Sequence, residues 1–124
     1  MEKVLVIDDD SLVRDTIVRI LERKGYQVLV ASDGVRGLRM FCSEQPDLVI
    51  TDIIMPEKEG IETIREIRGD CPDAKIIAIS GGGRIGNVDF LKIAEKLGAS
   101  EIIAKPFDPS VLVNLVSRCL GAPA

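Results

Sequence analysis

The chain has 124 residues, of which 46% are hydrophobic and 29% charged, values typical of one globular domain. Sixteen Lys and Arg against 20 Asp and Glu leave a net charge of −4, which argues against direct nucleic-acid binding, because that function requires a basic face. The absence of His excludes zinc sites of the His or Cys/His kind, a histidine general base and a phosphohistidine on this chain.

Apolar segments in the sequence are all shorter than the ~20 residues of a membrane span. The chain also starts directly with a predicted strand, without an apolar signal segment before it. We therefore expect a cytoplasmic protein that does not insert into a membrane and whose three cysteines are reduced.

Short runs rich in β-branched residues alternate with amphipathic stretches along the whole chain. The predicted strands lie at 3–8, 26–31, 47–52, 74–80 and 100–104. The predicted helices lie at 10–24, 33–45, 59–68, 87–97 and 108–120. Nearly continuous apolar strands are typical of a parallel sheet covered on both faces. The pattern predicts one α/β domain over residues 1–121 with a doubly wound sheet, followed by a frayed tail at 122–124.

Acidic residues mark the predicted starts of three helices. Asp33 stands before Gly34, and Asp108 is followed by Pro109, a pair typical of an N-cap and the first helical residue. Asp10 is interpreted in the same way, as an N-cap or first-turn acid of the first helix.

Polar residues follow four of the predicted strands. Asp8 and Asp9 follow the first strand, and Asp52 ends the third. Ser80 closes the fourth, and Lys105 follows the fifth. Because the carboxyl ends of strands in an open α/β sheet line one crevice, we expect three carboxylates, a hydroxyl and an ammonium to converge there.

This set of groups suits a divalent metal and a phosphoryl group. Adjacent carboxylates repel one another, and a bound cation offsets this repulsion. Oxygen ligands favour Mg²⁺. A carboxylate can also attack phosphorus and form an aspartyl phosphate. Taken alone, Ser80 is typical of a turn and Lys105 is typical of a solvated strand end. They support a functional site because each of them ends a strand of the same predicted sheet.

Four segments in order carry a family resemblance: Val-Leu-Val-Ile-Asp-Asp-Asp at 4–10, Asp-Leu-Val-Ile-Thr-Asp-Ile-Ile-Met-Pro at 47–56, Ile-Ile-Ala-Ile-Ser-Gly at 76–81, and Gly-Ala-Ser with Ala-Lys-Pro-Phe at 98–107. With these segments the chain resembles the receiver (CheY-like) domains of two-component response regulators, from residue 3 to about 120. The resemblance implies a five-stranded parallel sheet of order 2-1-3-4-5 with five helices on its two faces. It also implies that Asp52 is the phospho-acceptor.

The resemblance assigns the metal ligands as well. Asp9 would bind Mg²⁺ directly and Asp8 through a water, with Asp52 and the backbone carbonyl of Ile54 completing the protein ligands. No other cofactor is implied.

Ser80 would be the switch hydroxyl and Lys105 the lysine that contacts the phosphate, with a cis bond between Lys105 and Pro106. The sequence departs from the family at Ile102, where Tyr or Phe usually stands, and in its glycine-rich loop at 81–86.

The function implied is a signalling switch and not a turnover enzyme. A sensor histidine kinase or a histidine phosphotransfer protein would supply the phosphoryl group. The phosphorylated domain would change the surface formed by residues 87–120 and act on an effector protein, or on an effector domain of a longer chain.

The alternative is a small aspartyl-phosphate phosphatase of the haloacid dehalogenase type, because Asp8 and Asp10 follow a strand with one residue between them. In those enzymes, Thr or Val usually stands where this chain has Leu12, and a chain of 124 residues is too short to include their cap domain. The receiver hypothesis is therefore favoured.

Overall fold

The structure is a computed structural model that describes residues 2–53, 60–80, 84–85, 88–89, 96, 98–105 and 107–121. Its elements, in chain order, are β1 (Lys3–Ile7), α1 (Ser11–Glu22), β2 (Gln27–Ala31), α2 (Gly34–Glu44), β3 (Leu48–Asp52), α3 (Gly60–Asp70), β4 (Ile76–Ser80), β5 (Arg84–Ile85), β6 (Val88–Asp89), β7 (Glu101–Ala104) and α5 (Pro109–Leu120).

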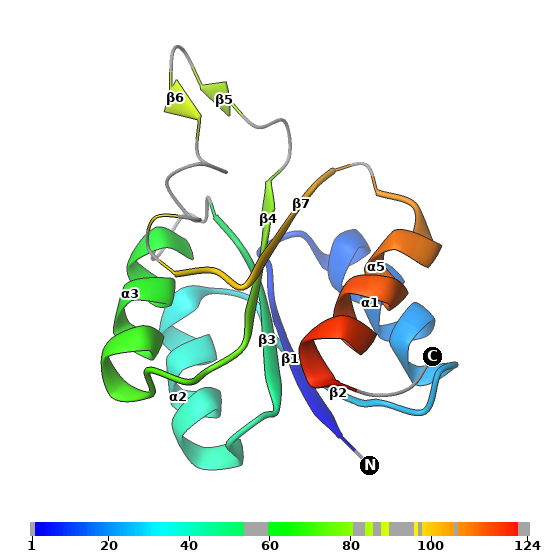
Figure 1. Ribbon diagram of the computed structural model, residues 1–124, viewed down its shortest axis with the longest axis horizontal. Helices are drawn as coiled ribbons and strands as arrows, with labels where there is room; N and C mark the ends of the chain where they lie inside the picture. Colours follow the sequence, from blue (N-terminus) through cyan, green and yellow to red (C-terminus); the bar gives the residue numbers. More distant parts are fainter. Residues whose placement is uncertain are drawn as a thin grey trace.

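Five parallel strands form the central sheet in the order β2-β1-β3-β4-β7, which confirms the predicted order (Figure 1). The register matters for function. Ile7 of β1 lies beside Thr51 of β3, and Asp52 lies beside Ile79 of β4. Residues that follow β1 and residues that end β3 therefore leave neighbouring strands at the same edge of the sheet.

Helices cover both faces of this sheet, with α1 and α5 on one face and α2 and α3 on the other (Figure 1). Side chains alternate along each strand, so Val4 and Val6 of β1 pack toward α1 and α5, whereas Leu5 and Ile7 pack toward α2 and α3. All four are fully buried. Each large aliphatic side chain buried in this way stabilises the fold by about 1.5–3 kcal/mol.

The three predicted N-caps are confirmed. Asp10 accepts a hydrogen bond from the Leu12 N–H, Asp33 from the Arg36 N–H, and Asp108 from the Ser110 N–H. Such caps satisfy N–H groups that have no partner inside the helix and typically contribute about 1 kcal/mol each. The five strands of the central sheet and helices α1, α2, α3 and α5 begin and end within two residues of their predicted bounds.

One predicted element is wrong at its start. The helix predicted over 87–97 begins where Val88–Asp89 forms β6, paired antiparallel with β5 (Figure 1). The pairs are Arg84 with Asp89 and Ile85 with Val88, separated in sequence by Gly86 and Asn87. This antiparallel pairing with a neighbouring segment outweighs the weak helical pattern of the sequence at 88–89. Lys96 is helical, and the rest of the predicted helix lies outside the described residues.

In the part of the chain described here, no helix combines the length and the hydropathy that crossing a bilayer requires.

Candidate phosphoryl-transfer and metal site

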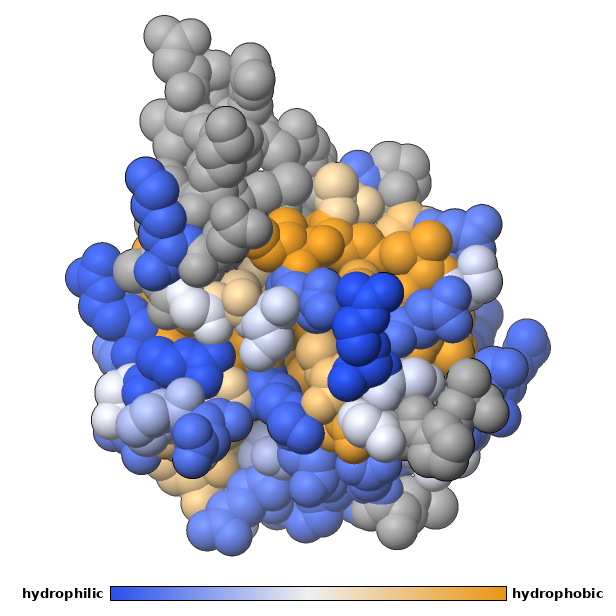
Figure 2. All heavy atoms as spheres, in the orientation of Figure 1, coloured by the Kyte–Doolittle hydropathy of each residue, from blue (hydrophilic) through white to orange (hydrophobic). Residues whose placement is uncertain are grey.

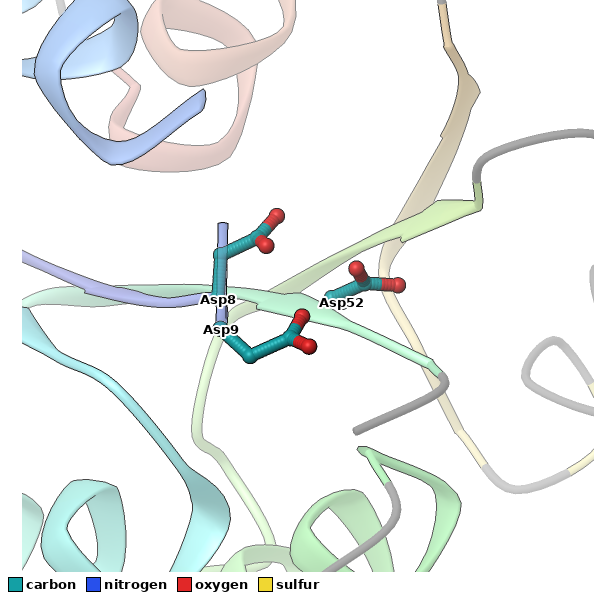
Figure 3. Close-up of side chains that lie close together, drawn as sticks. All are labelled: Asp8, Asp9 and Asp52. Carbon is teal, nitrogen blue, oxygen red and sulfur yellow. The ribbon is translucent and has the colours of Figure 1, made fainter. Parts of the chain in front are cut away.

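Three carboxylates meet at the carboxyl edge of the sheet (Figure 3). Asp8 and Asp9 follow β1, Asp52 ends β3, and their potential ligand oxygens all lie within 4.8 Å of one another. Asp8 and Asp52 are buried, whereas Asp9 is exposed. The predicted convergence of these three residues is confirmed, and the group could hold a metal ion with oxygen ligands and one side open to water.

Lys105 reaches the same group of carboxylates from β7, the strand at one edge of the sheet. It follows β7, which is separated from β3 by β4. Its Nζ donates to Oδ2 of Asp8 at 3.0 Å and to Oδ2 of Asp52 at 3.1 Å. Its side chain is only 18% exposed, so these charge-assisted bonds are partly shielded from water. The ammonium thus joins the ends of β1 and β3.

Burial and pairing shift two pKa values in the site. Burial raises the pKa of Asp8, against the lowering effects of hydrogen bonds from the Asp10 N–H and from Lys105. Partial burial acts to lower the pKa of Lys105, but the hydrogen bond to Asp8 and the charge of Asp52 outweigh it and raise that pKa. Lys105 therefore stays an ammonium.

When all three carboxylates are ionised, one ammonium leaves an excess of two negative charges, the charge that one divalent cation would balance. The donor set therefore fits Mg²⁺, which usually binds one or two carboxylates, waters and phosphate oxygens.

Two residues that support this site were missed by the sequence analysis. Arg14 of α1 donates from Nη1 to the backbone oxygen of Asp8 at 2.7 Å. Gly60 opens α3 so close to β3 that a Cβ at this position would collide with the backbone oxygen of Asp52. The signals available were an arginine in the second turn of the first predicted helix and a glycine at the predicted start of the third.

Other predicted site residues are only partly described. The backbone of Ser80 ends β4 and pairs with Ala104, but its side chain lies outside the described part of the structure. Ile54 and Pro106 lie outside the described residues altogether. Ile102 of β7 pairs with Ala78 of β4 and is half-buried. The roles of Ser80 and Ile54 and the cis peptide therefore stay predictions.

The surface beside the site is mixed in character. Figure 2 shows hydrophilic residues over much of one face and an apolar area near β7 and α5. Leu12 and Val111 are 75% and 45% exposed, at the starts of α1 and α5. α1 begins two residues after Asp9, and α5 begins four residues after Lys105.

Comparison with known proteins identifies the family. Residues 4–117 match the response regulator receiver domain, and the chain belongs to this family. As a receiver domain it is a phospho-accepting signalling switch of two-component systems. Members of the family typically bind Mg²⁺ through acidic residues, as the Asp group here would allow. The matches give no support to the phosphatase alternative.

Two curated relatives illustrate the similarity. The chain is 40% identical over 111 residues to a probable transcriptional regulator, ycf27, of Guillardia theta, covering 90% of this chain and 42% of that protein. It is 35% identical over 120 residues to the response regulator MprA of Mycobacterium tuberculosis, covering 94% of this chain and 48% of MprA. The chain thus spans about half the length of these relatives, or less.

Solved structures agree with this assignment. A response regulator receiver domain protein from Clostridium thermocellum has a TM-score of 0.89 and 35% identity, covering 98% of this chain and 95% of that one. A CheY-like receiver domain protein from Methanospirillum hungatei also has a TM-score of 0.89, with 28% identity, covering 98% of this chain and 94% of that one.

Proposed function

We propose that Asp52 is the residue that accepts the phosphoryl group. The observation that carries the proposal is the position of the Asp52 carboxylate at the end of β3. It accepts a hydrogen bond from the Lys105 ammonium at 3.1 Å, and its ligand oxygen lies within 4.8 Å of those of Asp8 and Asp9. In the transfer, the P–N bond to the donor imidazole breaks as a P–O bond to Asp52 forms. Such a transfer needs positioning and charge neutralisation more than any further covalent help from the protein.

Asp8, Asp9, Asp52 and the backbone carbonyl of Ile54 would hold Mg²⁺, with Asp9 a direct ligand and Asp8 a ligand through water. When bound, the ion supplies positive charge that offsets the charge on the phosphoryl oxygens. Lys105 would exchange its present bond to Asp52 for one to a phosphoryl oxygen while Asp8 still holds it. Ser80, at the end of the neighbouring strand, would donate to another oxygen.

The domain would work as a switch that catalyses only its own phosphorylation and dephosphorylation. Rearrangement of Lys105 and Ser80 around the phosphoryl group would bias the surface made by the helix predicted at 87–97, β7 and α5. Ile102 stands where the aromatic partner of the switch hydroxyl is usual, so we propose that the change passes through β7 without a rotating ring.

The partners follow from the family and from the surface. We expect a sensor histidine kinase or a histidine phosphotransfer protein as donor, and the exposed apolar side chains of Leu12 and Val111, near the starts of α1 and α5, suit a protein that docks there. Residues 1–121 would form one cytoplasmic receiver domain with no direct role in nucleic-acid binding or membrane insertion, and 122–124 its frayed tail. Its target would be an effector protein or an effector domain on a longer chain, as the greater length of the relatives suggests.

Chemical phosphorylation tests the acceptor. Incubation with acetyl phosphate and Mg²⁺ should add one phosphoryl group to the wild type, detected as intact mass, and none to Asp52→Asn. Asp15→Asn, an exposed aspartate of α1, serves as the control and should be labelled like the wild type. Labelling of Asp52→Asn at the wild-type rate would contradict the assignment. Sustained hydrolysis of a phosphate ester in the same sample would favour the phosphatase alternative.

A further inference from the structure

We infer that Arg14 is a positioning residue of the metal site: its guanidinium holds the backbone that presents Asp9. The inference rests on the proposed function, because it takes Asp9 as a direct ligand of Mg²⁺. Its starting point is the hydrogen bond of 2.7 Å between Nη1 of Arg14 and the backbone oxygen of Asp8. Arg14 itself is half-buried in α1.

The Asp8 carbonyl lies just past the end of β1, where both of its strand ladders stop. The last pairs are Ile7 with Ala31 of β2 and Ile7 with Thr51 of β3. The Asp8 N–H still donates to the oxygen of Ala31 at 3.1 Å, but the strand pairing does not extend to the Asp8 carbonyl. The guanidinium thus satisfies a backbone oxygen of a buried residue, where a missing partner would be costly.

The residue after Asp9 is held as well. The N–H of Asp10 donates to Oδ1 of Asp8 at 2.9 Å, and the carboxylate of Asp10 caps α1 through the Leu12 N–H. The carbonyl of Asp10 accepts from the Arg14 N–H at 3.1 Å, so Arg14 is bonded on both sides of Asp9. Asp9 therefore occupies a short backbone segment with fixed ends, while its own side chain is exposed.

Arginine suits this task better than lysine. Its planar guanidinium keeps its charge and offers several N–H donors in a fixed plane, whereas an ammonium on a flexible stem is placed less exactly. Residues that orient metal ligands without touching the metal usually change affinity by 10–100-fold when they are replaced. Loss of the guanidinium should leave Asp9 chemically intact and spread its carboxylate over more positions, so that Mg²⁺ binds more weakly.

Calorimetric titration with Mg²⁺ tests this. We expect about tenfold weaker binding for Arg14→Met and a smaller loss for Arg14→Lys, which keeps one charged donor. Arg19→Met is the matched control, because Arg19 is an exposed arginine of the same helix and its replacement removes the same charge. It should bind Mg²⁺ within about twofold of the wild type, as expected for an exposed charge screened by salt.

A second measurement separates positioning from folding. The acetyl phosphate reaction of Arg14→Met should be slow at low Mg²⁺ and should approach the wild-type rate when Mg²⁺ is saturating. Urea unfolding of the metal-free variants reports whether the fold itself has suffered. If Arg14→Met does not fold, the comparison of Arg14→Lys with the wild type decides.

Three results would overturn the inference: equal Mg²⁺ affinity of the Arg14 and Arg19 variants, a rate defect that saturating Mg²⁺ leaves unchanged, or an affinity loss only in variants that are unfolded. A wild type that binds no Mg²⁺ would instead contradict the metal site of the proposed function, and this inference with it.

Discussion

At the residue scale, Asp8 is the clearest case of function placed above stability. Its carboxylate is fully buried, and burial raises its pKa even though Lys105 and the Asp10 N–H both donate to it. A neutral side chain would be cheaper to bury, because the charged form loses its hydration. A role of the Asp8 carboxylate in metal binding would explain why the protein keeps a buried charge that lowers its stability.

This argument predicts opposite effects of Asp8→Asn on stability and on metal binding. The variant should be more stable than the wild type in the absence of metal at neutral pH, because the buried charge is gone. Its affinity for Mg²⁺ should fall by tenfold or more, as is usual when a group that supports a metal site is lost. Urea unfolding without metal and calorimetric titration with Mg²⁺ measure the two effects.

The pH dependence has a definite sign. A raised pKa in the folded state means that the folded protein takes up a proton at a higher pH than the unfolded chain, whose Asp titrates near 3.8. The stability linked to Asp8 is therefore fully present below that value and is lost as the pH rises through the raised folded pKa. The stability advantage of Asp8→Asn should grow over the same interval. An advantage that grows toward acid pH would contradict this account.

At the element scale, the contact between the start of α3 and the end of β3 shapes the site. The N–H of Gly60 donates to the oxygen of Ile53 at 2.7 Å, and no side chain fits between Gly60 and the Asp52 carbonyl. Only glycine allows the helix to begin this close to the strand that carries the proposed acceptor.

We therefore predict that Gly60→Ala destabilises the protein by about 1–3 kcal/mol, the usual cost of overpacking a dense interior, and slows phosphorylation of Asp52. Gly69→Ala in the same helix is the control, since nothing lies within 4 Å of the added Cβ. Alanine there should stabilise the protein by about 0.5–1 kcal/mol, because glycine is a poor helix former. Urea unfolding and the acetyl phosphate reaction measure both variants. Similar behaviour of the two would show that the contact at Gly60 is unimportant.

At the scale of the whole molecule, metal binding and folding should be coupled. Asp8 and Asp9 follow β1, Asp52 ends β3, and the lysine that joins them follows β7. The unfolded chain does not hold Asp52 and Lys105 near Asp8 and Asp9, so Mg²⁺ should bind the folded state almost exclusively.

Mg²⁺ at about 100 times its dissociation constant should therefore raise the free energy of unfolding by about 2.7 kcal/mol. Asp9→Ala should lose most of this gain, although Asp9 is exposed and contributes little to the metal-free fold. Urea unfolding of the wild type and of Asp9→Ala, each with and without Mg²⁺, measures the stabilisation that Mg²⁺ gives. Equal stabilisation of the wild type and Asp9→Ala would place the metal elsewhere.

The sequence alone determined the elements and the chemistry that they carry. Apolar periodicity reports burial, so it located the five strands of the central sheet and most helices within two residues, but not the short pair β5 and β6. The caps at Asp33 and Asp108 obey local hydrogen-bond rules. Polar residues at strand ends identified Asp8, Asp9, Asp52 and Lys105 as one candidate group. The order of the strands came from family resemblance, because the residue pattern shows that a strand is buried and not which neighbour it pairs with.

Only the tertiary structure decided how these parts meet. The order β1-β3-β4-β7 places Lys105 two strands away from Asp52, and a long side chain crosses that interval to bond both Asp8 and Asp52. The reach of Arg14 to the Asp8 carbonyl and the close approach at Gly60 depend on where helices pack on the sheet. Periodicity carries no information about either, because side-chain reach and interatomic clearance are set by packing in three dimensions.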